Sequence, residues 1–489
     1  RFHGQLRAAS LDRHAPGMTP SDAAYREAKE RFYQGHSGGT SLEVVGLTSL
    51  APVSLLLVQA IGIALPGSAR WLGGSAAQGA LSTLCVTIPM YVSFTAPEWA
   101  WAMAQSQLLA AAAVLWAAGA RAGSTREAMA SISEALNRPH KPFMATYRGM
   151  MMLATCMAIL AVDFQNFPRR LAKTETYGVS LMDAGVGSVL LSQAMVSPLS
   201  RKPSSAVAQR LGASLLSSSP LIAIGGVRLL GTRAAQYHEH ASEYGVHWNF
   251  FFTLAAISAL CNCVPLTGWK AALGAGALSI SYEVVLQTTS LSEYVLSAPR
   301  VDLFSANREG VLGCIGYCSV FYAGVALGGS IFASQHSGRG WLIHAAKLGM
   351  VSACLWVCSA IMTAAGMQTS RRLVNLPYVT WTLAHNSFTL AQFLVCEIAL
   401  HLIVGRDGGG VSAWRARAGR QSEILSDSIN RNQLFIFLIS NLLTGLVNMT
   451  LPTLNAPDWM ASTTVLSYSI TVTSIAMALD AFGVTLKFW

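Results

Sequence analysis

Charged residues are scarce in this sequence. Only 11% of the 489 residues are Asp, Glu, Lys or Arg, whereas 52% are hydrophobic, and the mean hydropathy is +0.43. A soluble domain carries about 25% charged residues, so the composition excludes an ordinary soluble protein and indicates a polytopic membrane protein. Alternating ten-residue strands, which mark membrane β-barrels, are also absent from the pattern. Helices therefore remain as the spanning structure.

Signals for metal or nucleic-acid binding are also missing. Nearly all of the nine cysteines lie in apolar stretches without a histidine at ligand spacing, which favours packing over zinc or disulfides. The net charge of +10 comes from cations in short connections rather than from a basic stripe with interleaved aromatic residues. We therefore expect no metal, no permanently bound cofactor and no nucleic-acid partner.

The apolar stretches predict an all-α protein with about thirteen membrane spans, since roughly 20 apolar residues cross a hydrocarbon core. A polar N-terminal segment, residues 1–43, precedes a single membrane domain over residues 44–489, in which 405–432 forms a cytoplasmic linker. The expected spans are 44–66, 78–96, 99–119, 150–163, 180–197, 211–230, 249–267, 270–289, 311–333, 341–366, 377–404, 433–453 and 460–483.

The distribution of Lys and Arg between alternate loops predicts the orientation. With the N-terminus on the lumenal or external side, the cytoplasmic loops hold about twice as many cations as the opposite loops. The polar tail carries six further cations and weakens the bias. This orientation places the 163–179 loop on the lumenal or external side and the C-terminus in the cytosol.

The most informative segment follows the apolar run Met150–Val162. That run ends at Asp163, and Lys173 follows ten residues later, beyond Pro168. Ionisable groups at the end of a membrane span are costly to place, which marks a candidate functional site. If the loop doubles back, an Asp/Lys pair can deprotonate a hydroxyl and stabilise an oxyanion. The alternative is structural, with Asp163 in a salt bridge at the helix end and the cations as interface anchors.

Two further polar groups stand at predicted helix ends or faces. Glu243, His247 and Trp248 crowd the start of the span at 249, where they could serve a head-group site or an interfacial structural role. Asn441 and Asn448 recur at helical spacing in an apolar run. Such a polar stripe either holds helices together or lines a polar cavity.

Several segments together resemble one family, the inositol acyltransferases of glycosylphosphatidylinositol (GPI) anchor synthesis, also called GPI-anchored wall transfer proteins. The resemblance covers almost the whole chain, and its motifs occur in the family's order. The matching segments are Lys29–Phe32, Gly38–Glu43, Ile159–Gly187, Tyr244–Phe251, Ser305–Gly310, Ser370–Tyr378, Asn441–Asn448 and Lys487–Trp489.

The resemblance implies a multi-pass enzyme of the endoplasmic reticulum membrane with thirteen spans. It would transfer a fatty acyl group, usually palmitoyl, from acyl-CoA as co-substrate to the inositol 2-hydroxyl of glucosaminyl-phosphatidylinositol. Carried onto this chain, it makes Asp163 the general base and Lys173 its partner. The expected head-group pocket comprises Arg169, Arg170, Glu175 and Asp183, with Glu243, His247 and Trp248 nearby and Asn441 and Asn448 as further candidates.

Direct attack on a thioester needs no covalent enzyme intermediate, but it requires a base, an oxyanion stabiliser and positioning. The acyl chain needs an apolar slot. The glycines at 185, 187, 324, 328 and 329 predict close helix contacts beside such a slot, or plain helix packing.

Two other functions fit parts of the pattern. Intramembrane charges such as Glu397, four residues before His401, would also suit a lipid or solute transporter. An acyltransferase of the separate membrane-bound O-acyltransferase class would rely on an intramembrane histidine, for which His385, His401 and His344 are candidates.

Overall fold

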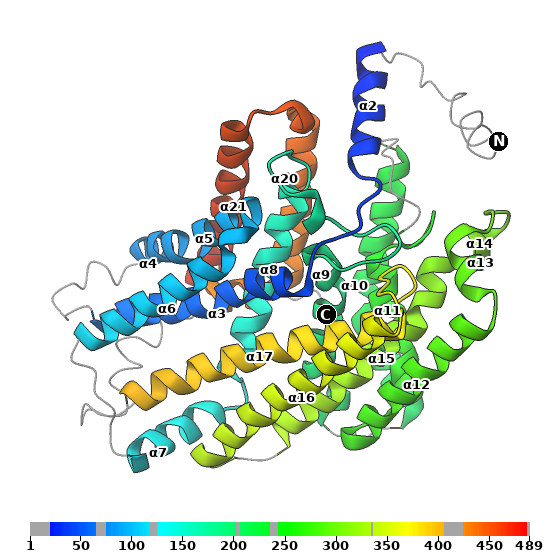
Figure 1. Cartoon of the computed structure of the whole chain (residues 1–489). Helices are drawn as coiled ribbons and strands as arrows, with labels where there is room; N and C mark the ends of the chain where they lie inside the picture. The colour runs from blue at the N-terminus through cyan, green and yellow to red at the C-terminus, as the bar shows by residue number, and fades with distance from the viewer. Residues whose placement is uncertain are drawn as a thin grey trace. The chain divides into compact units, whose positions relative to one another are not determined.

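The computed structural model describes residues 20–64, 75–117, 125–201, 206–234, 243–333, 336–404 and 424–486. Every regular element in these residues is a helix, and none is a strand, which confirms the predicted all-α class (Figure 1). Residues 1–19 of the predicted N-terminal segment and 405–423 of the predicted linker lie outside the described residues.

The helices include one or more in each predicted apolar stretch and several shorter ones between them. They are α2 (Pro20–Phe32), α3 (Ser41–Ala64), α4 (Ser75–Ser82), α5 (Ile88–Thr95), α6 (Ala100–Ala117), α7 (Thr125–Leu136), α8 (Pro142–Ala161), α9 (Leu181–Val196), α10 (Val207–Ala234), α11 (Phe250–Cys263), α12 (Gly268–Thr288), α13 (Leu291–Ser297), α14 (Leu303–Ala306), α15 (Arg308–Phe332), α16 (Gly338–Ala364), α17 (Leu376–Val404), α19 (Ile424–Arg431), α20 (Gln433–Thr450) and α21 (Asp458–Ala481).

Not all of these helices can span a membrane. In the described residues, nine are long and apolar enough, or ten if α11 and α12, bent by 119° at their junction, count as one span. The predicted count of thirteen is therefore not confirmed. The predicted span 180–197 is the 16-residue helix α9, about 24 Å long at 1.5 Å per residue and short of a 30 Å core. The span predicted at 78–96 is interrupted by a π-helical turn at Thr83–Thr87 before Pro89.

The chain divides into two compact units, Arg1–His36 and Ser37–Trp489. The described part of the first unit contains α2, a polar helix with an ion pair between Arg31 and Glu27. The second unit holds all the other helices.

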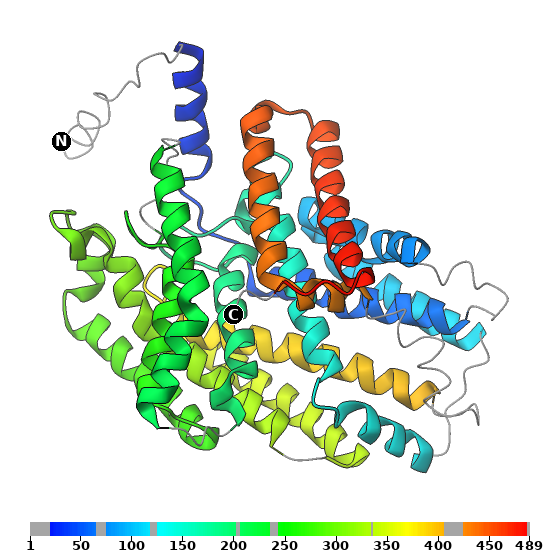
Figure 2. The same cartoon turned by 180° about the vertical axis from the view of Figure 1, so that it is seen from behind.

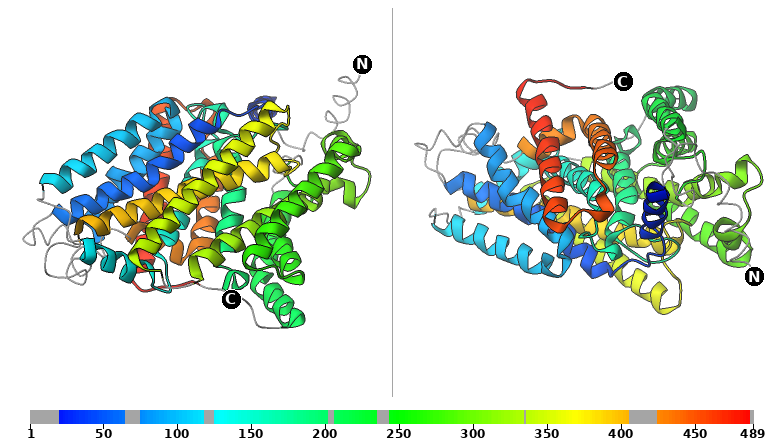
Figure 3. Two further views of the ribbon diagram at one scale, coloured as in Figure 1. Left: turned by 60° about the horizontal axis from the view of Figure 1, so that its bottom comes forward. Right: turned by 90° about the horizontal axis from the view of Figure 1, so that it is seen from above.

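Within the second unit, long helices pack side by side in the order α6, α3, α17 and α16 (Figure 3, left). Helix α8 crosses this group and packs against α17, α19, α20 and α21. Two-thirds (67%) of α8 is buried, against 17% of α20. Seen from behind, α20 and α21 form a hairpin in orange and red beside α8 (Figure 2). Helix α8 is thus a largely buried helix, and the candidate site lies at its C-terminal end.

Glycines allow two other helices to approach each other closely. A Cβ atom added at Gly324 of α15 would lie 2.7 Å from Ala194 Cβ and 2.8 Å from the Leu191 carbonyl oxygen, both in α9. Gly328 faces the Met195 carbonyl in the same way, whereas a Cβ atom at Gly185 would meet open space. The predicted close helix contacts are confirmed at Gly324 and Gly328, and also at Gly187 of α9, where a Cβ atom would clash with the Thr382 side chain of α17. The predicted apolar slot beside them stays a prediction.

The last part of the predicted 405–432 linker is not a solvated loop. Residues 424–431 form α19, in which Leu425 and Ile429 are buried in the main hydrophobic core. Gly149 of α8 allows the close approach, because a Cβ atom there would clash with the Ser426 carbonyl oxygen. Leu425 and Ile429, four residues apart, form a buried helix face. This spacing predicts a helix, but it directly follows glycine-rich residues that are typical of a linker.

Candidate active site

Asp163 lies one residue beyond the helix cap of α8. Its side chain is buried, with 6% exposure, and its backbone N–H donates to the Leu160 carbonyl at 3.1 Å. The Asn448 amide donates to Asp163 Oδ2 at 2.5 Å, and the Thr453 hydroxyl donates to Asn448 Oδ1 at 3.3 Å. Because an ionised carboxylate only accepts hydrogen bonds, the NH₂ end of the amide faces it. The predicted polar residue Asn448 therefore meets the predicted base directly.

Arg169 holds the backbone on both sides of Asp163. Its guanidinium donates to the carbonyl oxygens of Val162 at 2.9 Å, Phe164 at 3.0 Å and Phe167 at 2.8 Å. These carbonyls follow the end of α8, where helix bonding stops and other donors must satisfy them. Arg169 thus fixes the loop that carries Asp163, a contact that its predicted place in the head-group pocket did not anticipate.

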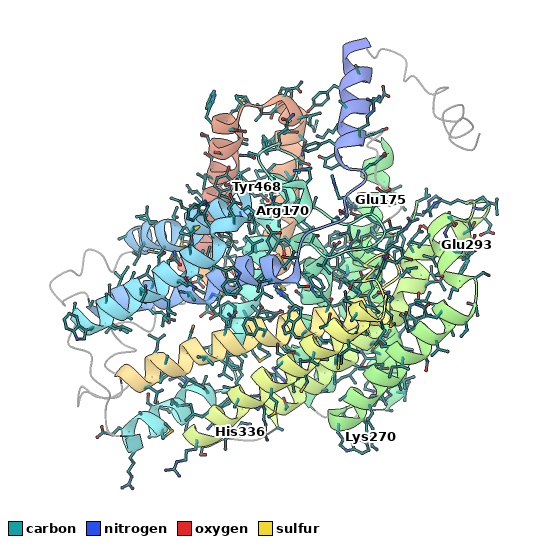
Figure 4. All side chains as sticks on the ribbon, in the orientation of Figure 1. Arg170, Glu175, Lys270, Glu293, His336 and Tyr468 are labelled. Atoms are coloured by element: carbon teal, nitrogen blue, oxygen red, sulfur yellow. The ribbon has the colours of Figure 1, made fainter. Side chains whose placement is uncertain are left out.

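Arg170 and Glu175, both labelled in Figure 4, lie on the same loop, and both are exposed. Arg170 pairs with Glu43 at 2.8 Å and with Glu98 at 3.6 Å, and its side chain is 46% exposed. Glu175 is exposed. Both side chains can therefore be reached from the loop surface.

Lys173 forms an ion pair with Glu243, in which Nζ lies 2.6 Å from Oε1. Burial raises the pKa of the Glu243 carboxyl, but the positive charges of Lys173 and Arg371 outweigh this effect and lower the pKa to about 2. Glu243 is therefore ionised at neutral pH. The structure brings together these two predicted residues, although they belong to different loops.

Asp183 is fully buried at the start of α9, with 0% exposure. Arg371 Nε donates to its Oδ1 at 2.7 Å, and Ser180 Oγ donates to its Oδ2 at 2.8 Å. The same carboxylate accepts the backbone N–H of Thr174 at 3.2 Å, directly beside Lys173. The buried pair thus fixes the backbone position from which the Lys173 side chain extends.

The predicted group around His247 packs on the Ser305–Gly310 segment. The backbone N–H of His247 donates to Asn307 Oδ1 at 2.7 Å, and the backbone N–H of Gly310 donates to the Tyr244 carbonyl at 2.8 Å. Gly245 has φ +123°, and a Cβ atom there would lie 2.5 Å from Asn307 Cα, so glycine suits this close approach.

The side chains of this group have distinct environments. The Trp248 indole donates to Thr253 Oγ1 at 2.9 Å. His247 Nδ1 is buried and has no hydrogen-bond partner in the described residues. A buried polar atom of this kind is available for a further contact.

Asn441 lies two turns before Asn448 on α20, but its contact is different. Its amide donates to the Phe437 carbonyl of the same helix at 2.6 Å. Thr444, between them, likewise donates to the Ser440 carbonyl at 2.9 Å. Of the two predicted asparagines, Asn448 is the one whose side chain donates to Asp163.

The histidines considered for a different acyltransferase class lie elsewhere. His385 is 3% exposed and stacks on Trp381 in α17. His401 contacts Ser131 at 2.9 Å and Glu397 at 3.3 Å, as its spacing predicted for the latter. Across the described ranges, no group of three or more His, Cys, Asp or Glu side chains is arranged to hold a metal ion.

Arg371 and Glu309 were not predicted as site residues. Glu309 is completely buried and pairs with Arg300 at 2.6 Å and with Arg372 at 2.9 Å. Both residues lie in segments that resemble the family. Their charge in apolar surroundings was the sequence feature that could have marked them as site residues. Asp183, the partner of Arg371, and Arg372, one partner of Glu309, come from distant parts of the chain, which the local pattern could not reveal.

Comparisons with known proteins place the chain in a family. Residues 25–479 match the model of the GWT1 family. A GPI-anchored wall transfer protein 1 of Gibberella zeae is 34% identical, covering 96% of this chain and 100% of that protein. A phosphatidylinositol-glycan biosynthesis class W protein of Dictyostelium discoideum is 32% identical over the same shares of the two chains. The relative from Aspergillus oryzae is 35% identical, over 95% of this chain and 100% of its own length. The chain, with its motifs in order and matched along nearly its whole length, belongs to the GWT1 family.

Proposed function

We propose that this protein acts in GPI-anchor biosynthesis as an acyl-CoA-dependent inositol acyltransferase. It moves a fatty acyl group, palmitoyl in the first instance, to the inositol 2-hydroxyl of glucosaminyl-phosphatidylinositol. The names of its relatives, which concern GPI-anchored proteins and phosphatidylinositol-glycan biosynthesis, support the pathway. The observation that carries the chemistry is the buried carboxylate of Asp163 at the end of α8, on the same short loop as Lys173.

Asp163 takes the proton of the inositol hydroxyl as its oxygen attacks the thioester carbonyl carbon. The C–O bond forms and the carbonyl oxygen becomes an oxyanion. When the oxyanion collapses, the C–S bond breaks and the CoA thiolate leaves with the electron pair, to be protonated from Asp163 or from water. General-base assistance of this kind contributes about 10²–10⁴-fold in rate. Asn448 supports the role of Asp163 by holding one carboxylate oxygen.

Lys173 supplies the positive charge that faces the developing oxyanion. Its partner Glu243 stays ionised because the pKa of that carboxyl is lowered to about 2 by Lys173 and Arg371 against the opposing effect of burial. Preorganised charge is effective since it needs no reorientation during the reaction. The buried Asp183–Arg371 pair, which bonds the Thr174 N–H, supports this preorganisation.

The acceptor head group lies, in this proposal, against the exposed part of the 163–179 loop. Arg170 offers a half-exposed cation for the phosphate of the lipid, and Glu175 offers a carboxylate for sugar hydroxyl or amino groups. His247, whose Nδ1 has no hydrogen-bond partner in the described part of the chain, is a further hydrogen-bonding group for the head group. Trp248 and Asn441 remain candidates for the walls of this pocket.

The protein works in the endoplasmic reticulum membrane, with the candidate site on the lumenal side, the N-terminus lumenal and the C-terminus cytoplasmic. In Figure 4 the loop that carries Arg170 and Glu175 lies above Lys270 and His336, which lie along the lower edge. This separation supports an alternation of the loops between two sides. No permanently bound cofactor takes part; acyl-CoA is the co-substrate.

The test is acyl transfer from labelled palmitoyl-CoA to glucosaminyl-phosphatidylinositol in membranes. Wild type should form the acylated lipid, and Asp163→Asn and Lys173→Met should lose this activity at matched expression. Retained binding of acyl-CoA in both variants would assign the loss to chemistry. A wild type that forms no acylated lipid but moves lipid across proteoliposomes would overturn the proposal in favour of a transporter.

A further inference from the structure

Arg148 is a charged residue inside a membrane-spanning helix that the proposed reaction does not use. It lies in the first half of α8, fifteen residues before Asp163 and therefore about 20 Å away along the helix axis. An ionisable residue within an apolar span is costly unless it is paired or functional. Its surroundings therefore need to be accounted for.

Among the described residues, the side chain of Arg148 contacts an amide rather than a carboxylate. One guanidinium nitrogen donates to Gln433 Oε1 at 2.8 Å, and Gln433 Nε2 approaches the Arg148 carbonyl at 3.4 Å. Nε is buried and has no hydrogen-bond partner among the described residues. Within the described ranges no carboxylate pairs with Arg148. The acidic side chain of Asp480 is already paired with Arg431 at 3.0 Å.

The residue that holds Arg148 begins helix α20. The first N–H groups of a helix lack intrahelical partners and carry a partial positive charge. The preceding residue, Asn432, does not cap them with its side chain. Instead, Asn432 donates to the Val484 carbonyl at 3.0 Å and accepts the Leu486 N–H at 2.7 Å. A cation and the positive end of an 18-residue helix thus lie together.

We propose that Arg148 and the N-terminal end of α20 form a binding site for a phosphate group, near the end of α8 remote from Asp163. Arginine binds phosphate through two parallel N–H donors, and helix N-termini bind the same anion. Gln433 holds the guanidinium in place. The phosphate belongs either to the nucleotide part of acyl-CoA or to a membrane phospholipid, since both present the same chemistry.

The assignment to acyl-CoA rests on the proposed function, whereas the phosphate site does not. It places the nucleotide part toward the cytoplasmic side, where the loop cations are more numerous. The Arg169 guanidinium bonds backbone carbonyls and Arg170 pairs with two carboxylates. Arg169 is thus occupied by these carbonyls, and the proposed function already assigns Arg170 to the phosphate of the acceptor lipid, so neither lumenal arginine is assigned to the CoA phosphates.

The test measures binding rather than turnover, so it does not depend on the acyltransferase activity. Full-length protein in detergent is titrated with unacylated CoA, and protein in phosphatidylcholine nanodiscs is compared with and without phosphatidylinositol. Arg148→Gln should weaken binding of one of these two probes by about tenfold or more. Arg148→Lys, which keeps the charge but loses the planar fork, should lie between. Inorganic pyrophosphate should compete with the bound probe.

Arg339→Gln is the matched control, because Arg339 is an exposed arginine on the first turn of α16. It should bind both probes as wild type does. Loss confined to CoA would identify the nucleotide phosphates, and loss confined to phosphatidylinositol would identify a lipid phosphate. Equal binding of both probes by wild type and Arg148→Gln would overturn the proposal. If Arg148→Gln does not fold, equal binding by wild type and Arg148→Lys together with no competition by pyrophosphate would do the same.

Discussion

Arg371 Nε lies 2.7 Å from Asp183 Oδ1 in the interior of the protein, where both side chains are at most 4% exposed. The Asp183 carboxylate also accepts the N–H of Thr174, so this single contact joins three separate segments beside Lys173. Removing one partner would leave a buried, uncompensated charge, which costs far more than the loss of a surface pair. Four consequences of this and related contacts can be measured.

Arg371→Met should lower the free energy of unfolding by about 3–5 kcal/mol, because Asp183 would lose its buried counter-ion. Arg170→Gln is the comparison, since its half-exposed pair with Glu43 contributes only about 0–1 kcal/mol. Thermal unfolding in detergent measures both. Similar midpoints for the two variants would contradict the prediction. Adding Asp183→Asn to Arg371→Met should recover part of the loss.

Asn448→Ala should lower the rate of acyl transfer by roughly 10- to 100-fold, because a hydrogen bond to a charged group contributes about 1.5–3 kcal/mol. Binding of acyl-CoA should be unchanged, since the amide contacts Asp163 rather than the CoA. Asn262→Ala is the control; that amide donates to the Ser258 carbonyl of its own helix at 2.8 Å. Normal turnover in Asn448→Ala would show that Asp163 does not need this contact.

Arg169→Lys should reduce kcat more than KM. A lysine keeps the positive charge but cannot donate to the separate carbonyls of Val162, Phe164 and Phe167 at once. The loop would then hold Asp163 less firmly. Steady-state kinetics at varied acceptor concentration separates the two constants. An increase in KM alone would instead support the predicted role of Arg169 in head-group binding.

The free energy of unfolding should decrease at acid pH because the Glu243 carboxylate becomes protonated. Because the pKa of this carboxyl is about 2 in the folded state, below its ordinary value of 4.5, its stabilising effect is complete above pH 4.5 and is lost as the pH falls toward 2. Glu243→Gln removes this contribution. Unfolding midpoints measured between pH 6 and the acid limit should therefore fall more steeply for wild type, and parallel curves would contradict the assignment.

Much of this architecture follows from local sequence patterns. Apolar runs predicted almost every long helix, since a span must be continuous and apolar. The number of spans could not be derived so simply, because α9 is apolar but short and α4–α5 is interrupted. Helix α19 was missed because its buried face, Leu425 and Ile429, directly follows a glycine-rich stretch.

The candidate site divides in the same way. The residue types and motifs indicated Asp163, Lys173 and Asn448, but not which side chains meet. Asn448 lies 285 residues from Asp163 along the chain. Arg371 lies 188 residues from Asp183. Such contacts depend on how whole helices pack, and helical periodicity defines a face without naming its partner.

The hydrogen bonds between the Asn432 side chain and the backbone of Val484 and Leu486 limit how this end of the protein can be altered. A deletion that removes Val484–Leu486 would free the Asn432 amide to cap its own helix, where it would compete with an incoming phosphate. Affinity tags and reporter fusions at this end should therefore be joined by a spacer beyond residue 486. Shortened variants should be checked for CoA and phosphatidylinositol binding before they replace the full chain in inhibitor screens.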